Sequence, residues 1–363
     1  MKFYIAATRQ NDGKTLACLG ITAALKKRFQ NVGYIKPVGQ RFIEIDGHKI
    51  DEDALLFKNV YNLSCDLQNM SPVAVPHGFT EAYIDNPDRE SISNSITKSF
   101  EAIDNASDVV VVEGTGHAGV GSVFDMSNAD VAKLLGCKVV LVASGGIGRP
   151  IDEIMLNKSM FDAAGVEVLG AIINKVEDAK YDKITDYVKR GLARKGIELL
   201  GVIPYRDMLS NPTVEQLIED INGTLLSGDM GMQNIVNRMI IGAMPPHQAI
   251  DYLKPDCLLI TPGTRDDLIL AALSSCIMQE SGQPSVAGII LTGGTPPQPN
   301  IMELVNKTHL PMILVQEDTF KVASKIAKLI VKIRPSDVEK IKVAEELIEK
   351  HVCIDRILEK VTL

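Results

Sequence analysis

The first thirty residues contain the feature that most limits how this chain folds. An apolar run at 2–7 leads into a polar loop that ends in Gly13-Lys14-Thr15, and a helical pattern follows at 15–29. A strand, a tight loop and a helix in this order bring backbone N–H groups to a helix N-terminus, where they surround phosphate oxygens. The lysine of such a loop supplies positive charge, and the threonine hydroxyl binds Mg²⁺. We therefore predict a phosphate-binding loop (P-loop) within an α/β fold.

The loop lacks the glycine that usually opens a P-loop, because Ala7 and Thr8 stand at that place. A Gly-Lys-Thr triplet arises easily by chance, so a working site, a decayed site and a coincidence are the alternatives. The strand before the triplet and the helix after it favour a working site. Alanine at position 7 is harmless if its backbone φ is negative and costly if it is not.

Short, continuous apolar runs indicate strands that are buried on both faces. In the first part of the chain they lie at 2–7, 109–112, 138–143, 168–173 and 199–203, with helical patterns such as 150–164 between them. Buried strands that alternate with helices predict a parallel sheet with helices on both faces. Together with the loop at Gly13-Lys14-Thr15, this pattern predicts a sheet of the P-loop NTPase type. We expect this domain to span residues 1–210.

A second set of apolar runs follows the turn signal Asn211-Pro212. We predict a smaller α/β domain over 211–334 and a C-terminal helix over 335–363, in which Ser336 and Glu339 have capping-box spacing. The predicted strands are 235–241, 257–261, 286–291 and 312–315, and the predicted helices are 266–279 and 319–332.

The amino-acid composition argues against some classes of binding partner. The formal net charge of −8 argues against nucleic acid and anionic membranes, because both require a basic face. The six cysteines form no CxxC pair, and no apolar run has the length of a signal-peptide core or a transmembrane helix. We expect a cytoplasmic protein.

Charged residues follow two other predicted strands. Glu113 ends the run VVVVE, and Lys36 follows the run GYI. Because the carboxyl ends of parallel strands meet at one edge of a sheet, both side chains are expected beside the P-loop. Asp51, Glu52 and Asp53 precede a helical pattern, and capping of that helix alone would explain them.

Residues 1–205 resemble the dethiobiotin synthetase family of P-loop enzymes, whose wider group includes the cobyrinic acid a,c-diamide synthases. The resemblance rests on five motifs in the family's order, which are the extended Gly-Lys-Thr loop, GYIKPV, DALL, VVVVEGTG and GAIINKV. Loops of this family are one residue longer than the usual P-loop, so Ala7 occupies the position of their first glycine. The resemblance implies that ATP and Mg²⁺ bind here.

The resemblance also implies a role for each matching position. Lys14 would contact the phosphates, and Lys36 would stabilise charge at the γ-phosphate and the acceptor during transfer. Thr15, Asp53 and Glu113 would hold Mg²⁺. The implied nucleotide-binding residues are Asn11, Asp12, Gly13, Lys14, Thr15 and Leu16 of the loop, Asn174 at the adenine edge, and Pro204 in the segment that closes over the base.

The acceptor end of the site departs from the family. Segment 71–85 has no clear match to the diaminononanoate-binding segment, and the loop after Glu113 is longer and different. His117 in that loop is a candidate substrate contact or proton carrier, although a solvated loop histidine is the commoner case. We therefore do not expect a dethiobiotin synthetase.

Two glycine-rich turns follow strands of the second domain. Their N–H groups, with Arg265, could bind an anion. The alternative is two tight turns in which Arg265 pairs with Asp266 or Asp267. The candidate ligand-binding residues are Thr261, Gly263, Arg265, Thr292, Gly293 and Gly294.

These turns also resemble the DRTGG domain, a module found in regulatory positions. A dethiobiotin-synthetase-like domain followed by DRTGG is the arrangement in the N-terminal half of long phosphotransacetylases. The sequence ends before any acyltransferase segment, so we expect the regulatory half on its own, paired as a homodimer. One hypothesis is therefore a nucleotide-binding regulator whose partner is an enzyme of acyl-phosphate metabolism. The other is an ATP-dependent ligase that phosphorylates a carboxylate or carbamate.

Overall fold

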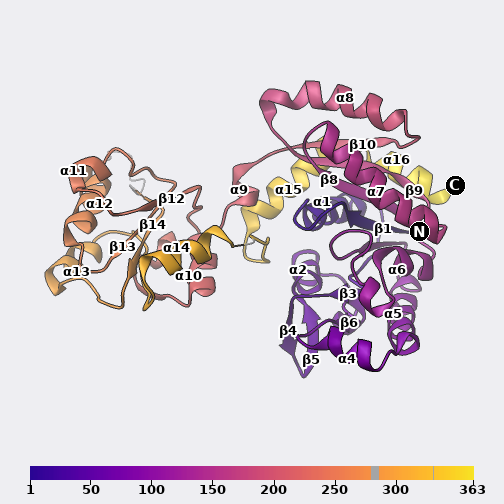
Figure 1. Ribbon diagram of the computed structural model, residues 1–363, viewed down its shortest axis with the longest axis horizontal. Helices are drawn as coiled ribbons and strands as arrows, with labels where there is room; N and C mark the ends of the chain where they lie inside the picture. Colours follow the sequence, from indigo (N-terminus) through magenta and orange to yellow (C-terminus); the bar gives the residue numbers. More distant parts are fainter. Residues whose placement is uncertain (279–285, 330) are drawn as a thin grey trace. The chain divides into compact units, whose positions relative to one another are not determined.

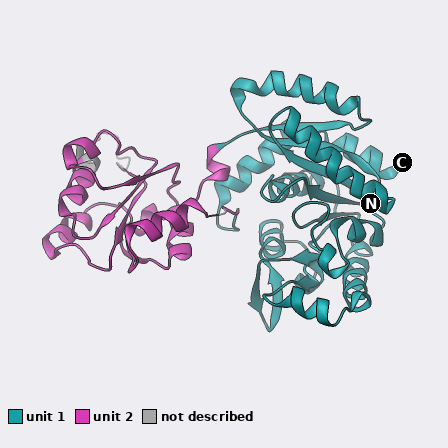
Figure 2. Cartoon of the chain, in the orientation of Figure 1, with its two compact units in different colours: residues 1–206, 333–363 teal, residues 207–332 magenta. Residues whose placement is uncertain are grey.

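The computed structural model describes residues 1–278, 286–329 and 331–363. The chain forms two compact units, of which unit 1 comprises residues 1–206 with 333–363 and unit 2 comprises residues 207–332 (Figure 2). The C-terminal segment therefore belongs to the same unit as the N-terminal strand. In the described residues, no helix is both long and apolar enough to cross a lipid bilayer.

Unit 1 is built on a six-stranded parallel sheet with the strand order β10-β9-β8-β1-β7-β2. Figure 1 labels β10, β9, β8 and β1 of this sheet. Strand β1 (Lys2–Ala7) lies in the interior of the sheet between β8 and β7, and β7 (Val109–Glu113) is buried at every position. Strands buried in this way need cover on both faces of the sheet, which confirms the predicted layered α/β fold. The other strands are β2 (Val32–Ile35), β8 (Lys138–Ser144), β9 (Val168–Val176) and β10 (Leu199–Pro204).

Helices follow most of these strands, as the apolar runs predict. Two small additions lie outside the main sheet, namely the parallel pair β3 (Val38–Gly39) and β6 (Val73–Ala74) and the hairpin β4 (Phe42–Ile45) and β5 (His48–Asp51). The helices of this part are α1 (Lys14–Lys26), α2 (Glu52–Tyr61), α3 (Leu67–Met70), α4 (Phe79–Asp85), α5 (Arg89–Asp104), η1 (Ser122–Phe124), α6 (Asn128–Leu134), α7 (Gly148–Ala164), η2 (Asp178–Lys180) and α8 (Tyr181–Ala193).

Unit 2 has its own five-stranded sheet with the order β11-β15-β14-β13-β12. Only the edge strand β11 (Thr224–Ser227) is antiparallel to its neighbour. The other strands are β12 (Arg238–Ile241), β13 (Cys257–Pro262), β14 (Gly288–Thr292) and β15 (Met312–Leu314). The helices are α9 (Asp207–Ser210), α10 (Val214–Ile221), η3 (Asp229–Gly231), α11 (Pro246–Ala249), α12 (Asp266–Met278), α13 (Pro299–Val305) and α14 (Thr319–Ala327). Two apolar clusters form its core on the two faces of this sheet.

The elements of unit 2 are mostly shorter than the sequence predicts. The predicted strand at 235–241 begins only at Arg238, and the predicted helix at 319–332 ends at Ala327. Apolar residues continue beyond both elements, so apolar character alone does not mark their ends. The predicted helix at 266–279 ends at Met278, and residue 279 lies outside the described residues.

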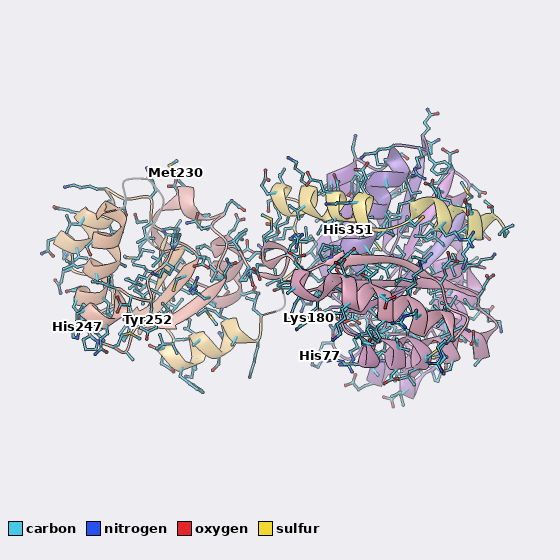
Figure 3. All side chains as sticks on the ribbon, turned by 90° about the horizontal axis from the view of Figure 1, so that it is seen from above. His77, Lys180, Met230, His247, Tyr252 and His351 are labelled. Atoms are coloured by element: carbon cyan, nitrogen blue, oxygen red, sulfur yellow. The ribbon has the colours of Figure 1, made fainter. Side chains whose placement is uncertain are left out.

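The C-terminal segment contains two helices where the sequence predicts one. Helix α15 (Val338–His351) and helix α16 (Ile354–Thr362) are separated at Val352, which forms an antiparallel bridge with Gly201 of β10. The predicted capping box is wrong, because the N-cap residue is Asp337 rather than Ser336 and its side chain makes no capping hydrogen bond to the first turn of α15. Helix α15 ends at His351 (Figure 3), whose Nδ1 lies 2.9 Å from the Tyr181 hydroxyl. The segment thus packs on unit 1 along α1, α8 and β10.

Candidate functional site

The P-loop connects the interior strand β1 with helix α1, and its first residue is compatible with alanine. Ala7 is still part of β1, opposite Val142, and its φ is not among the positive values of the chain. A glycine is therefore not needed for backbone geometry at this position. Gly13 is different, because its φ is 97° and a Cβ atom there would lie 2.0 Å from Nδ2 of Asn174.

The loop presents donors that the protein itself does not use. In the described part of the chain, no acceptor is found for the N–H groups of Gln10, Asn11, Asp12 and Gly13. The Lys14 ammonium likewise has no hydrogen bond or ion pair there, although the residue is only 9% exposed. Burial lowers the pKa of Lys14, and the nearby carboxylate of Glu113 opposes this effect. A helix N-terminus with unused N–H groups and a buried lysine suits an anion.

Asp12 holds the loop from within. Its Oδ2 accepts hydrogen bonds from the Thr8 hydroxyl at 2.7 Å and the Arg9 N–H at 2.8 Å, and its Oδ1 accepts one from Ser144 at 2.5 Å. Burial raises the pKa of the Asp12 carboxyl, against the effect of the Ser144 and Thr8 hydrogen bonds. The side chain of Asp12 is therefore engaged by the protein, which leaves its backbone N–H for a ligand.

A lysine and three carboxylates meet beside the loop. The Lys36 ammonium donates to Asp53, lies 3.3 Å from Oδ1 of Asp51 and lies 3.7 Å from Oε1 of Glu113. All four residues are buried. Burial disfavours the charge on Lys36, but the three carboxylates outweigh burial and raise the pKa of its ammonium well above the ordinary value. The sequence predicts Lys36 and Glu113 at one sheet edge, and the family resemblance adds Asp53 as a metal ligand. The structure brings the three side chains together.

Glu113 links this cluster to the P-loop. Its Oε1 accepts from the Thr15 hydroxyl at 2.9 Å, and its Oε2 accepts from the Tyr34 hydroxyl at 2.9 Å. The hydroxyl of Thr15 and the carboxylates of Asp53 and Glu113 are hard oxygen donors, which fit Mg²⁺. In the described residues, no set of three or more His, Cys, Asp or Glu side chains has the spacing of a metal site. Lys36 lies where the carboxylates converge instead.

The two residues expected at the nucleotide base, Asn174 and Pro204, lie on β9 and β10 of the main sheet. Asn174 is buried, and its Nδ2 donates to the Asp12 carbonyl at 2.9 Å while its Oδ1 accepts from the Lys175 N–H at 2.8 Å. Lys175 also donates through Nζ to the Asn11 carbonyl at 2.8 Å. Pro204 is buried at the end of β10, next to β9. Contact of Asn174 and Pro204 with a base stays a prediction, whereas the support of Asn174 for the loop is observed.

His117 lies on the surface of the loop after Glu113. Its side chain is exposed, and its Nδ1 accepts from the Gly119 N–H at 3.2 Å. No other side chain is seen to hold the imidazole within the described residues, so the arrangement matches a solvated loop histidine.

The two turns of unit 2 use most of their polar groups internally. The N–H groups of Gly263, Gly293 and Gly294 donate to backbone carbonyls at 2.9–3.1 Å. Arg265 forms a two-point ion pair with Asp267 and donates to the carbonyls of Gly242 and Met244. The Thr261 hydroxyl lies 3.4 Å from the Gly242 carbonyl oxygen. The hydroxyls of Thr292 and Thr319 form a hydrogen bond of 2.7 Å. These contacts favour the alternative of two tight turns over an anion site.

Three residues of the site were not predicted from the sequence. Tyr34 lies inside the motif GYIKPV, but an apolar run gives no sign that its hydroxyl reaches Glu113. Asp51 was explained as a helix cap, and it does cap α2 while also facing Lys36. Ser144 ends β8, the neighbour of β1, and this placement at the sheet edge was the available signal.

Comparison with known families agrees with this arrangement. Residues 1–213 match the model of an AAA domain family (AAA_26), which covers more than half of the chain. Residues 216–329 match the model of the DRTGG domain. The expected order of a P-loop domain of this group followed by a DRTGG domain is therefore confirmed.

Curated relatives match nearly the whole length of this chain. A phosphate acetyltransferase from Nitratidesulfovibrio vulgaris is 28% identical over 96% of this chain and 50% of its own length. A phosphate acetyltransferase from Synechocystis is 25% identical over 98% of this chain and 51% of its own length. The chain thus spans about half the length of the curated relatives it matches.

Among solved structures, the septum site-determining protein MinD from Pyrococcus horikoshii, complexed with Mg-ADP, is similar at 16% identity. The match covers 58% of this chain and 84% of MinD, with a TM-score of 0.37. A likeness of this size is too weak to support a conclusion.

Proposed function

The chain belongs to the AAA domain family and carries a DRTGG domain behind its P-loop domain, and from this premise we propose that it binds ATP with Mg²⁺ and regulates acyl-phosphate metabolism. The P-loop of unit 1 would hold the nucleotide, and unit 2 would respond to a ligand or pair two copies of the chain. The enzyme partner would be of the phosphotransacetylase type, because the curated relatives are phosphate acetyltransferases. We place this protein in the cytoplasm.

The observation that carries nucleotide binding is the unused charge of Lys14. A buried ammonium without an acceptor is costly. Lys14 lies at the start of α1 beside loop N–H groups for which the described residues likewise provide no acceptor. Phosphate oxygens would satisfy both kinds of donor at once. Thr15, Asp53 and Glu113 would hold Mg²⁺, which when bound neutralises charge on the phosphates.

Calorimetric titration tests this proposal. ATP and ADP are titrated into the full chain with and without Mg²⁺, and Lys14→Ala is compared with Lys183→Ala, an exposed lysine of α8. We expect Mg²⁺-dependent binding that Lys14→Ala weakens about tenfold to a hundredfold, since a hydrogen bond to a charged group contributes about 1.5–3 kcal/mol. Lys183→Ala should bind like the wild type. No nucleotide binding by the intact chain would contradict the proposal.

A second candidate function is an ATP-dependent ligase. It is favoured by Lys36, which reaches Asp53 and Glu113 beside the P-loop, at the side where an acceptor would approach the γ-phosphate. Transfer of that phosphoryl group to a carboxylate oxygen would break its bond to ADP and form an acyl phosphate. ADP release that rises with one member of a carboxylate panel would favour the ligase. Binding of ATP without any stimulated ADP release would favour the regulator.

A further inference from the structure

The Lys36 ammonium occupies the point on which three carboxylates converge. These carboxylates come from separate parts of unit 1, namely Asp51 at the end of β5, Asp53 in the first turn of α2 and Glu113 at the end of β7. Glu113 has no exposed surface, and Lys36 is 6% exposed. The arrangement is thus a buried ion cluster, not a surface salt bridge.

Charge balance explains why a cation is needed next to the three carboxylates. Three carboxylates packed together in a poorly hydrated place repel one another strongly unless a positive charge lies among them. Lys36 supplies that charge, and Lys14 is the other ammonium close to Glu113. Two of the three carboxylates, Asp53 and Glu113, are the same groups that fit Mg²⁺. One set of oxygens therefore serves either a lysine or a metal ion.

We propose that Lys36 is an internal counter-cation that closes the Mg²⁺ site of this chain until a nucleotide arrives. This inference rests on the proposed ATP site and adds an order of events to it. Without nucleotide, the Lys36 ammonium compensates Asp51, Asp53 and Glu113, so a free divalent ion finds the site occupied. When the phosphates bind, their negative charge draws the ammonium towards the P-loop, and the metal ion takes its place.

The lysine side chain of Lys36 allows this exchange of its ammonium for a metal ion. A lysine carries a compact charge on a flexible four-carbon stem, so its ammonium can turn from one group of oxygens to another without movement of the backbone. The backbone N–H of Lys36 is fixed by the Met70 carbonyl at 2.8 Å, which holds the base of the stem in place. A neutral side chain of similar length should remove one positive charge from beside the three carboxylates and leave its place to a divalent ion.

Binding of Mn²⁺ alone tests the proposal without nucleotide or turnover. Free Mn²⁺ is counted by electron paramagnetic resonance in the presence of the wild-type chain, Lys36→Met, Lys36→Arg and Lys158→Met. Lys158 serves as the control because its ion pair is with Asp162 of the same helix, α7, and with none of the three carboxylates. Circular dichroism checks that each variant is folded.

We expect Lys36→Met to bind Mn²⁺ at least about tenfold more tightly than the wild type, because a full negative charge is released for the ion. Lys36→Arg and Lys158→Met should bind as weakly as the wild type. Equal Mn²⁺ affinity of Lys36→Met and the wild type would overturn the proposal.

The wild type gives an independent test if Lys36→Met does not fold. Addition of ADP should tighten its binding of Mn²⁺ at least about tenfold, after subtraction of the Mn²⁺ that the same concentration of ADP binds without protein. Tight binding of Mn²⁺ by the nucleotide-free wild type would overturn the proposal. The comparison of Mn²⁺ binding by the wild type and Lys36→Met contains no nucleotide. A negative result there can therefore be distinguished from a failure of the chain to bind ATP.

Discussion

At the scale of single residues, Asp12 shows how a P-loop without its first glycine keeps its shape. The carboxylate accepts hydrogen bonds from the Thr8 hydroxyl, the Arg9 N–H and the Ser144 hydroxyl, which ties the start of the loop to the end of β8. Asn174 supports the same turn from outside through the Asp12 carbonyl. The loop is thus held by side chains in addition to the backbone conformation.

Replacement of Asp12 by alanine should therefore destabilise unit 1. Alanine leaves three donors without their acceptor, and we expect the free energy of unfolding to fall by about 1–3 kcal/mol. Asp12→Asn should lose less, because an amide oxygen still accepts from Arg9 and Thr8 while the Ser144 hydroxyl can accept from the amide. Urea unfolding measures the free energy of unfolding of both variants. Asp85→Ala, at an exposed position, is the control. A loss in Asp12→Asn as large as in Asp12→Ala would contradict this account.

At the scale of elements, the sequence predicts best what depends on local pattern. The strands of unit 1 appear as continuous apolar runs, and β1 is predicted at its observed bounds of Lys2–Ala7. The meeting of Lys36 and Glu113 follows from the rule that parallel strands end at one edge. The ion pair between Arg265 and Asp267 was one of two open alternatives, since backbone carbonyls that hold the guanidinium are invisible in a sequence.

The docking of the C-terminal helices could not be predicted, because it depends on contacts between distant segments. The sequence predicts a helix in this segment, but it does not predict the packing of α15 on α1, more than 300 positions earlier in the chain. This packing places Ile348 against Gly20, where a Cβ atom would lie 2.3 Å from Cγ1 of Ile348 and 2.9 Å from the Ala344 carbonyl oxygen. Gly20 therefore allows the two helices to approach closely.

Gly20→Ala tests this close packing. In an ordinary helix this change stabilises by up to about 1 kcal/mol, but here the added methyl group has no room. We expect a loss of about 1–3 kcal/mol in the free energy of unfolding, measured with urea. Gly148→Ala is the matched control, since Gly148 begins α7 and a Cβ atom there meets nothing within 4 Å. Stabilisation by both changes would mean that α15 does not pack tightly on α1.

At the scale of the whole molecule, the chain leaves unit 1 after Arg206 and returns to it at Ile333. Each unit has its own sheet and its own buried apolar residues, so each can unfold as a cooperative body. The P-loop and its carboxylates belong entirely to unit 1, whereas the DRTGG turns belong entirely to unit 2. A nucleotide that binds at the P-loop should therefore stabilise unit 1 directly.

We predict that ATP with Mg²⁺ raises the unfolding temperature of unit 1 and leaves that of unit 2 unchanged. Seven of the eight tyrosines lie in unit 1, and only Tyr252 (Figure 3) lies in unit 2, so tyrosine fluorescence of Tyr252→Phe follows unit 1 alone. At a nucleotide concentration one hundred times the Kd, the stabilisation should be about 2.7 kcal/mol. Calorimetry of the same sample reports both units. At the same nucleotide concentration, Lys14→Ala should reduce the stabilisation of unit 1 to about 0.4–1.4 kcal/mol, because its Kd is about tenfold to a hundredfold higher. An equal shift of both transitions would mean that nucleotide binding couples the units.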